Sequence, residues 1–203
     1  MRRYLVYLIL GVALGLALIA GVVLAKPYTL RGSVLVPPVP APDFTLTAGD
    51  GSPWQLSAQQ GKLVLMFFGY TTCPDVCPAT LGELQQLRVQ LGEERARDVQ
   101  VVFITVDPQR DTPDRLGKYV VSFDPTFAAL SGSEADLLPV WQAYGVYREI
   151  RPNASGAAYL VDHTARTYLI DRTGKLRVSY SFGTPLDDLV QDVRFLLKEK
   201  VQQ

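Results

Sequence analysis

The sequence predicts an α/β domain that follows a single N-terminal membrane-spanning helix. Two observations predict the domain. Residues 63–68 and 101–106 are short, continuous apolar runs, as expected of strands buried on both faces of a sheet. An amphipathic stretch with helical spacing lies between these two runs. A third observation predicts the membrane helix, because residues 4–25 are 22 consecutive positions without a charged side chain.

The uncharged run is long enough to cross a bilayer. At the rise of an α-helix it spans roughly 30 Å, the thickness of the hydrocarbon core. A secretory signal has an apolar core of only ~7–15 residues before its cleavage site, so we expect an uncleaved anchor. Arg2 and Arg3 precede the run. The positive-inside rule therefore predicts a single pass through the inner membrane, with the domain on the periplasmic (extracytoplasmic) side.

The chain is expected to have three parts: an anchor over 1–25, a tether over 26–41 and one domain over 42–203. The tether is rich in proline, which gives a segment an extended and semi-stiff character. Four of the 20 basic residues and none of the 20 acidic residues precede residue 42, which leaves 16 basic and 20 acidic side chains in the domain. A mildly acidic domain without a basic cluster argues against nucleic acid as a partner.

Strands and helices alternate along the predicted domain. The helix after the first strand carries Cys77, Leu81, Leu84, Leu87 and Leu91 at helical spacing. A strand, a helix and a second strand in this order imply a right-handed crossover and a parallel pair of strands.

The remaining elements complete a recognisable order. Thr112 and Thr184 are each followed by proline, the pattern of a helix N-cap with proline at the first helical position. The other expected elements are helices over 112–122, near 133–145 and over 184–200, a β-hairpin of 167–170 and 176–180 around the turn 171–175, and a short strand pair at 43–46 and 54–56. The order β-α-β-α-(α)-β-β-α is that of a thioredoxin-like domain.

Three side chains stand out as candidate metal ligands. Cys73 and Cys77 are the two cysteines of the chain, and His163 is its single histidine. The cysteine segment and Asp107 each follow the carboxyl end of a predicted parallel strand, the edge where open α/β sheets bind ligands. If the strand at 167–170 is antiparallel, His163 lies at the same edge. Two thiolates and one imidazole suit a soft, low-coordinate metal ion, above all Cu(I).

The spacing of the two cysteines adds a second property. Pro78 is expected to be the first helical residue, so Cys77 lies at a helix N-terminus, where the helix dipole favours the thiolate over the thiol. The pair is also close enough to form a disulfide if the loop allows it. Tyr70 is expected to contribute packing only.

At these residues the chain resembles the Sco (SenC) family of copper proteins. The matching words are Ala41-Pro42-Asp43-Phe44, then 68–78 with both cysteines, Val106-Asp107-Pro108-Gln109-Arg110-Asp111-Thr112-Pro113, and Val161-Asp162-His163-Thr164. The resemblance covers the domain from about residue 41 to its last helix, together with the preceding anchor. One departure is Thr72, where many relatives carry another residue, and it leaves the three candidate ligands intact.

The resemblance implies a membrane-anchored metallochaperone. It would bind one copper ion, as Cu(I) or Cu(II), through Cys73, Cys77 and His163, and deliver it to the binuclear copper A centre in subunit II of cytochrome c oxidase. Other periplasmic copper chaperones or thioredoxin-like reductases are further implied partners. The resemblance also suggests a supporting role near the metal for Asp107.

Several alternatives remain open at this point. The main one is a thiol–disulfide oxidoreductase that uses Cys73 and Cys77 as a redox-active pair and reduces the cysteines of the copper A site. Against it, three residues separate these cysteines where thioredoxins have two, and no proline lies between Pro152 and Pro185 to supply the cis-proline of that family. A peroxiredoxin would need threonine three residues before its reactive cysteine, and neither cysteine of this chain has one there.

Other classes use the same residues in different ways. A redox or copper sensor would need the same trio, but the chain offers no cytoplasmic output domain. Zinc would prefer a fourth ligand. A plain structural disulfide would close an unusually short loop, and a lone histidine is often only a hydrogen-bonded or surface residue.

Overall fold

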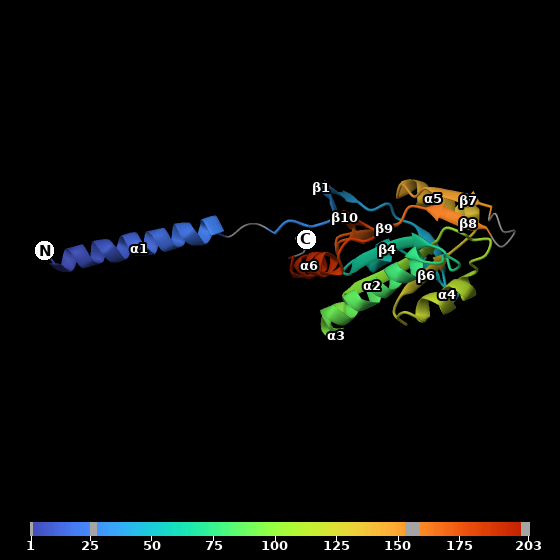
Figure 1. Cartoon of the computed structure of the whole chain (residues 1–203), viewed down its shortest axis with the longest axis horizontal. Helices are drawn as coiled ribbons and strands as arrows, with labels where there is room; N and C mark the ends of the chain where they lie inside the picture. Colours follow the sequence, from blue (N-terminus) through green and yellow to red (C-terminus); the bar gives the residue numbers. More distant parts are fainter. Residues whose placement is uncertain (1, 25–27, 153–158, 200–203) are drawn as a thin grey trace.

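The computed structural model describes residues 2–24, 28–152 and 159–199 (Figure 1). Its first element is a helix, α1 (Arg2–Leu24), of which the side chains at 2–4 and 6–16 are described. Among the described residues, no helix is at once long and apolar enough to cross a membrane. The membrane-spanning helix predicted over 4–25 stays a prediction.

An eight-stranded mixed sheet with the strand order β1-β10-β9-β4-β5-β6-β2-β3 forms the centre of the domain (Figure 1). Its central strands β4 (Leu63–Gly69) and β5 (Val99–Thr105) are parallel, and β9 (Arg166–Ile170) is antiparallel to β4. The other strands are β1 (Ser33–Pro40), β2 (Thr45–Ala48), β3 (Pro53–Gln55), β6 (Ala128–Ser131) and β10 (Lys175–Ser181). A separate two-stranded sheet pairs β7 (Arg148–Arg151) with β8 (Leu160–His163).

Helices cover both faces of the sheet, which explains why its central strands are apolar throughout. Phe67 and Phe68 are neighbours on β4 and therefore point to opposite faces. Phe67 packs on Phe103, with 5.9 Å between ring centroids, whereas Phe68 packs on Tyr144 at 5.9 Å and on Tyr168 at 5.8 Å. The helices are α2 (Val76–Leu91), α3 (Glu93–Ala96), α4 (Pro113–Val121), α5 (Glu134–Ala143) and α6 (Leu186–Lys198), with a 3-10 turn at Ser57–Gln59.

The predicted order of the main strands and helices is confirmed, but one helix cap and several short strands differ. Thr112 caps α4 as expected, because its hydroxyl accepts a hydrogen bond from the backbone N–H of Arg115. The cap predicted at Thr184 is wrong: this hydroxyl donates to the carbonyl of Ser181, and α6 starts after Pro185 without a side-chain cap. The strands β6, β7 and β8 were not predicted.

The tether predicted over 26–41 needs a correction, because most of it belongs to the folded domain. Ser33–Pro40 is the edge strand β1, antiparallel to β10. An edge position tolerates its prolines, since the N–H that proline lacks would face away from the sheet. Before β1, Tyr28 stacks on Phe195 of α6 with 4.5 Å between centroids and donates a 2.5 Å hydrogen bond to Asp192. The domain therefore begins by residue 28.

Candidate metal centre

The two cysteines lie where a central strand passes into a helix. β4 ends at Gly69, and the loop that follows carries Cys73 to the start of α2. Cys77 is the second residue of this helix, which begins at Val76, two residues earlier than predicted from Pro78. Cys77 is completely buried, whereas Cys73 is partly exposed.

His163 reaches the same edge of the sheet from the far end of the sequence. It is the last residue of β8 and lies three residues before β9. Because β9 is antiparallel to β4, its beginning lies beside the end of β4. The sequence-based expectation that the three side chains meet at this edge of the sheet is confirmed.

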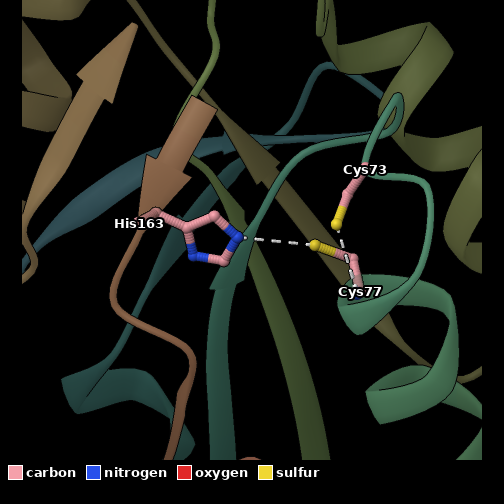
Figure 2. Close-up of side chains that lie close together, drawn as sticks. All are labelled: Cys73, Cys77 and His163. Carbon is pink, nitrogen blue, oxygen red and sulfur yellow. Dashed lines mark hydrogen bonds between the residues drawn. The ribbon is translucent and has the colours of Figure 1, made fainter. Parts of the chain in front are cut away.

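Three ligand atoms converge in the space between these segments (Figure 2). The two Sγ atoms and a ring nitrogen of His163 all lie within 4.8 Å of one another. The Nε2 atom of His163 is 3.6 Å from the Sγ of Cys77, and the backbone N–H of Cys77 donates to the Sγ of Cys73 over 3.4 Å. Among the described residues, no further cysteine or carboxylate joins this group. A tetrahedral zinc site would need a fourth ligand.

The surroundings of His163 fix which nitrogen can bind a metal. Nδ1 lies 3.2 Å from the carbonyl oxygen of Thr164. A carbonyl can only accept, so this contact assigns the hydrogen to Nδ1 and leaves the lone pair on Nε2, which faces the sulfur atoms. The ring packs edge-on against Phe67 and Tyr70, with centroids 6.2 and 5.8 Å away. The imidazole is therefore both oriented and in the tautomer that a metal ligand requires.

The two thiols differ in their readiness to ionise. A hydrogen bond from the thiol of Cys77 lowers the pKa of Cys73 well below that of an ordinary thiol, and hydrogen bonds from His163 and from the backbone N–H groups of Cys77 and Asp75 act in the same direction. The same bond to Cys73, together with burial, raises the pKa of Cys77. These shifts favour the thiolate at Cys73, so the prediction that the helix N-terminus favours it at Cys77 is wrong.

A buried carboxylate holds the loop that carries Cys73. Asp111 is fully buried and accepts hydrogen bonds from the backbone N–H of Thr71 at 3.0 Å and from its hydroxyl at 2.5 Å. The hydroxyl of Thr105 donates to it at 2.9 Å. Burial raises the pKa of Asp111, and these hydrogen bonds act against that shift. Asp111 thus ties the loop to the end of β5.

Sequence reasoning missed the role of Gly69. A Cβ atom at this position would lie 2.8 Å from the Sγ of Cys77 and 2.7 Å from the ring of Phe103. Only a residue without a side chain leaves room for this sulfur beneath the end of β4. The available signal was a glycine directly after a continuous apolar run, which marks a close approach of another group to the strand.

Asp107 and Tyr70 lie beside the three candidate ligands and not among them. Asp107 is fully buried near the site, but it does not belong to the group of ligand atoms. It forms an ion pair with Arg110 and accepts a 2.8 Å hydrogen bond from the hydroxyl of Tyr159. Tyr70 packs, as predicted, and its hydroxyl also accepts a 3.3 Å hydrogen bond from the backbone N–H of Val161.

Comparison with known proteins agrees with this geometry. The family model for SCO1/SenC matches residues 37–198. The chain belongs to the SCO1/SenC family. The SCO2-like protein of Rickettsia prowazekii is 36% identical over 133 residues, which are 65% of this chain and 64% of that protein. The aligned part of the chain thus spans just under two thirds of this SCO relative.

Solved structures of Sco proteins share the fold. ScoI of Bradyrhizobium japonicum, solved with copper bound, is 37% identical with a TM-score of 0.70, and the match covers 78% of this chain and 99% of ScoI. A structure of BsSco is 26% identical with a TM-score of 0.64 and covers 85% of this chain and 100% of that one. BsSco is described there as having a disulfide switch and as a member of the Sco family of cytochrome c oxidase assembly proteins.

Proposed function

We propose that this chain is a membrane-anchored copper chaperone that binds one copper ion through Cys73, Cys77 and His163. It would deliver the ion to the copper A centre in subunit II of cytochrome c oxidase. One observation carries the proposal: two sulfur atoms and the lone-pair nitrogen of an oriented imidazole lie within 4.8 Å of one another. Copper-bound and oxidase-assembly relatives of the same fold support the choice of metal and of partner.

The donor set suits copper in both oxidation states. Soft thiolates favour Cu(I), and the imidazole completes a three-ligand site that can also hold Cu(II) with added water or oxygen ligands. Both cysteines must be reduced before loading, because a disulfide cannot supply two thiolate ligands. Copper loading therefore depends on the redox state of the pair. The disulfide switch described for BsSco is consistent with such a dependence.

A variant of His163 tests the proposal in cells. The reduced full-length chain should bind one copper ion, and His163→Ala should weaken that binding strongly because the imidazole is one of only three donors. In cells that carry His163→Ala in place of the native gene, we expect cytochrome c oxidase activity to fall and to recover at least partly when copper is added to the medium.

The same variant separates the chaperone from the reductase. Thiol–disulfide exchange needs both cysteines but no imidazole across the site, so exchange by purified His163→Ala should stay near the parent's level. Full oxidase assembly in the His163→Ala strain under copper limitation would contradict the copper-carrying role. A reductase that acts on the copper A cysteines would then be the better explanation.

The anchor is the second part of the proposal. The 22-residue uncharged run supports it, as do the described apolar side chains of α1, which are exposed along the helix; Tyr4, Tyr7 and Leu8 are among them. The remainder of the chain, residues 26–203, would face the periplasm.

Reporter fusions test this orientation. A reporter that is active only outside the cytoplasm should be active when it is fused after Gln203, since Arg2 and Arg3 keep the N-terminus inside. The same fusion to a chain that starts at residue 28 is the control and should be inactive. Activity of a cytoplasm-only reporter on the full chain would contradict the orientation, and a mature N-terminus near Lys26 would contradict the anchor.

A further inference from the structure

The strand that carries His163 is not part of the central sheet. Among the described strands, β8 pairs with β7 in a separate two-stranded sheet, whereas both cysteines follow β4 in the middle of the main sheet. The hydrogen bonds of the central sheet hold β9, three residues after His163, but they do not reach the strand that carries the imidazole. Contacts between the β7–β8 hairpin and the rest of the domain complete its placement.

One face of β8 makes these contacts. Side chains alternate along a strand, so residues 159, 161 and 163 lie on the same side. The side chains on this side are partly or fully buried, whereas Leu160 and Asp162 are exposed. The face that turns toward the domain at Tyr159 and Val161 is thus the face that presents the imidazole of His163.

Arg110 contacts Tyr159, the first residue of this face. Its guanidinium carbon lies 3.7 Å from the centroid of the Tyr159 ring, and Nη1 donates a 2.7 Å hydrogen bond to the carbonyl oxygen of Tyr159. Nε forms an ion pair with Asp107, which also accepts from the hydroxyl of Tyr159. Planar stacking combined with two directed hydrogen bonds is a geometry that arginine provides and lysine does not.

Tyr70 contacts Val161 and His163 on the same face. Its hydroxyl accepts the hydrogen bond from the N–H of Val161, and its ring packs edge-on against His163. The guanidinium of Arg110 lies 5.6 Å from the Tyr70 ring, within the range of a cation–π contact. Tyr70 belongs to the loop of Cys73, so these contacts join the cysteine side of the site to the histidine side.

We propose that Arg110 is a positioning residue for His163, which it holds against the cysteines through Tyr159 and the face of β8. The inference rests on the proposed function for the identity of the metal ion. Two thiolates retain part of the affinity for Cu(I), whereas Cu(II) depends more strongly on the imidazole. Arg110 therefore tunes which oxidation state the site prefers, and loss of Arg110 weakens Cu(II) binding more than Cu(I) binding.

The first measurement uses the metal-free chain. His163 is the single histidine in the sequence, so one ring Cε1–H signal in the NMR spectrum reports its environment without assignment. In full-length, reduced Arg110→Ala this signal should shift or broaden relative to the parent. The matched control is Arg151→Ala, on the same hairpin, because Arg151 is exposed and, within the described part of the chain, its ion pairs are with the exposed side chains of Glu149 and Asp162. Its signal should match the parent's.

The second measurement uses the same variants loaded with copper. Arg110→Ala should lose at least tenfold in Cu(II) affinity and less than threefold in Cu(I) affinity. A tenfold selective loss corresponds to a rise of about 59 mV in the reduction potential of the bound ion. In the His163→Ala background, Arg110→Ala should cause no further loss of Cu(II) affinity, because the ligand that Arg110 positions is then absent.

Clear outcomes overturn the inference. It fails if Arg110→Ala leaves the ring signal unchanged and the Cu(II) affinity within twofold of the parent's. It also fails if the loss of Cu(II) affinity caused by Arg110→Ala adds fully to the loss caused by His163→Ala. Removing Arg110 leaves the buried Asp107 without its cation, which can prevent the variant from folding. In that case Tyr70→Phe serves as the second variant and should also change the ring signal of His163. If the parent itself binds no copper, the proposed function fails, while the metal-free measurement still decides the role of Arg110.

Discussion

Serine in place of Cys77 should abolish tight Cu(I) binding. The site has three donors, and an alcohol oxygen cannot replace a thiolate as a ligand for a soft ion. We expect the Cu(I) affinity of reduced Cys77→Ser to fall by at least ~10³-fold, which corresponds to about 4 kcal/mol of binding free energy. Competition with a chromogenic Cu(I) chelator measures this loss.

Cys73→Ser serves as the matched comparison. It should abolish tight binding to the same extent, but the two variants should differ in stability. Cys77 is completely buried and Cys73 is partly exposed, so only Cys77→Ser places a hydroxyl in an apolar environment, at a cost of about 1–3 kcal/mol. Denaturant unfolding of the metal-free chains tests this difference. Retention of one-to-one Cu(I) binding by either variant would contradict the three-ligand site.

A methyl group at position 69 should disturb both the fold and the site. In Gly69→Ala the new Cβ would meet the Sγ of Cys77 at 2.8 Å and the ring of Phe103 at 2.7 Å, and neither neighbour is the free end of a flexible chain. Overpacking of this kind costs about 1–3 kcal/mol. It should also push the sulfur out of line with the Nε2 of His163 and lower the Cu(I) affinity about tenfold, the equivalent of 1.4 kcal/mol.

Gly82 offers the control for this substitution. It lies inside α2, and a Cβ there would meet nothing within 4 Å. Gly82→Ala should therefore stabilise the domain by about 0.5–1 kcal/mol through the helix propensity of alanine, without a change in copper affinity. Unfolding curves and copper titrations of both variants test the pair. Equal stability of Gly69→Ala and the parent would show that the sulfur does not need the space beside Gly69.

The parts of the fold that sequence alone predicted are those with a strong local pattern. Continuous apolar runs identify β4 and β5, and the turn at 171–175 identifies the β9–β10 hairpin. β1 was hidden because its prolines indicate an extended linker, and only its pairing with β10 makes it a strand. β7 was hidden because Arg148–Arg151 is largely charged and draws its stability from the neighbouring strand rather than from burial.

The features of the site divide in the same way into those that the sequence predicts and those that it does not. The ligand trio was predictable because the chain has so few cysteines and histidines that topology leaves one combination. The contacts that support the trio were not. Arg110 and Tyr70 act on Tyr159 and Val161, 49 and 91 positions away in the sequence, and no local spacing reveals a contact over such separations. Gly69 was missed because its role is the space that it leaves.

The unequal burial of the two sulfur atoms would give the proposed handover of copper a direction. An acceptor's ligand would approach the ion from the side of the partly exposed Cys73 and His163, since Cys77 has no surface open to solvent. Ligand substitution would then proceed one donor at a time, and Cys77 would be the last ligand to dissociate from the ion. Throughout such an associative exchange the ion always has a thiolate partner, so a free cuprous ion never enters the surrounding water. The acceptor, in turn, must present its first ligand on a protruding segment rather than from the floor of a cleft.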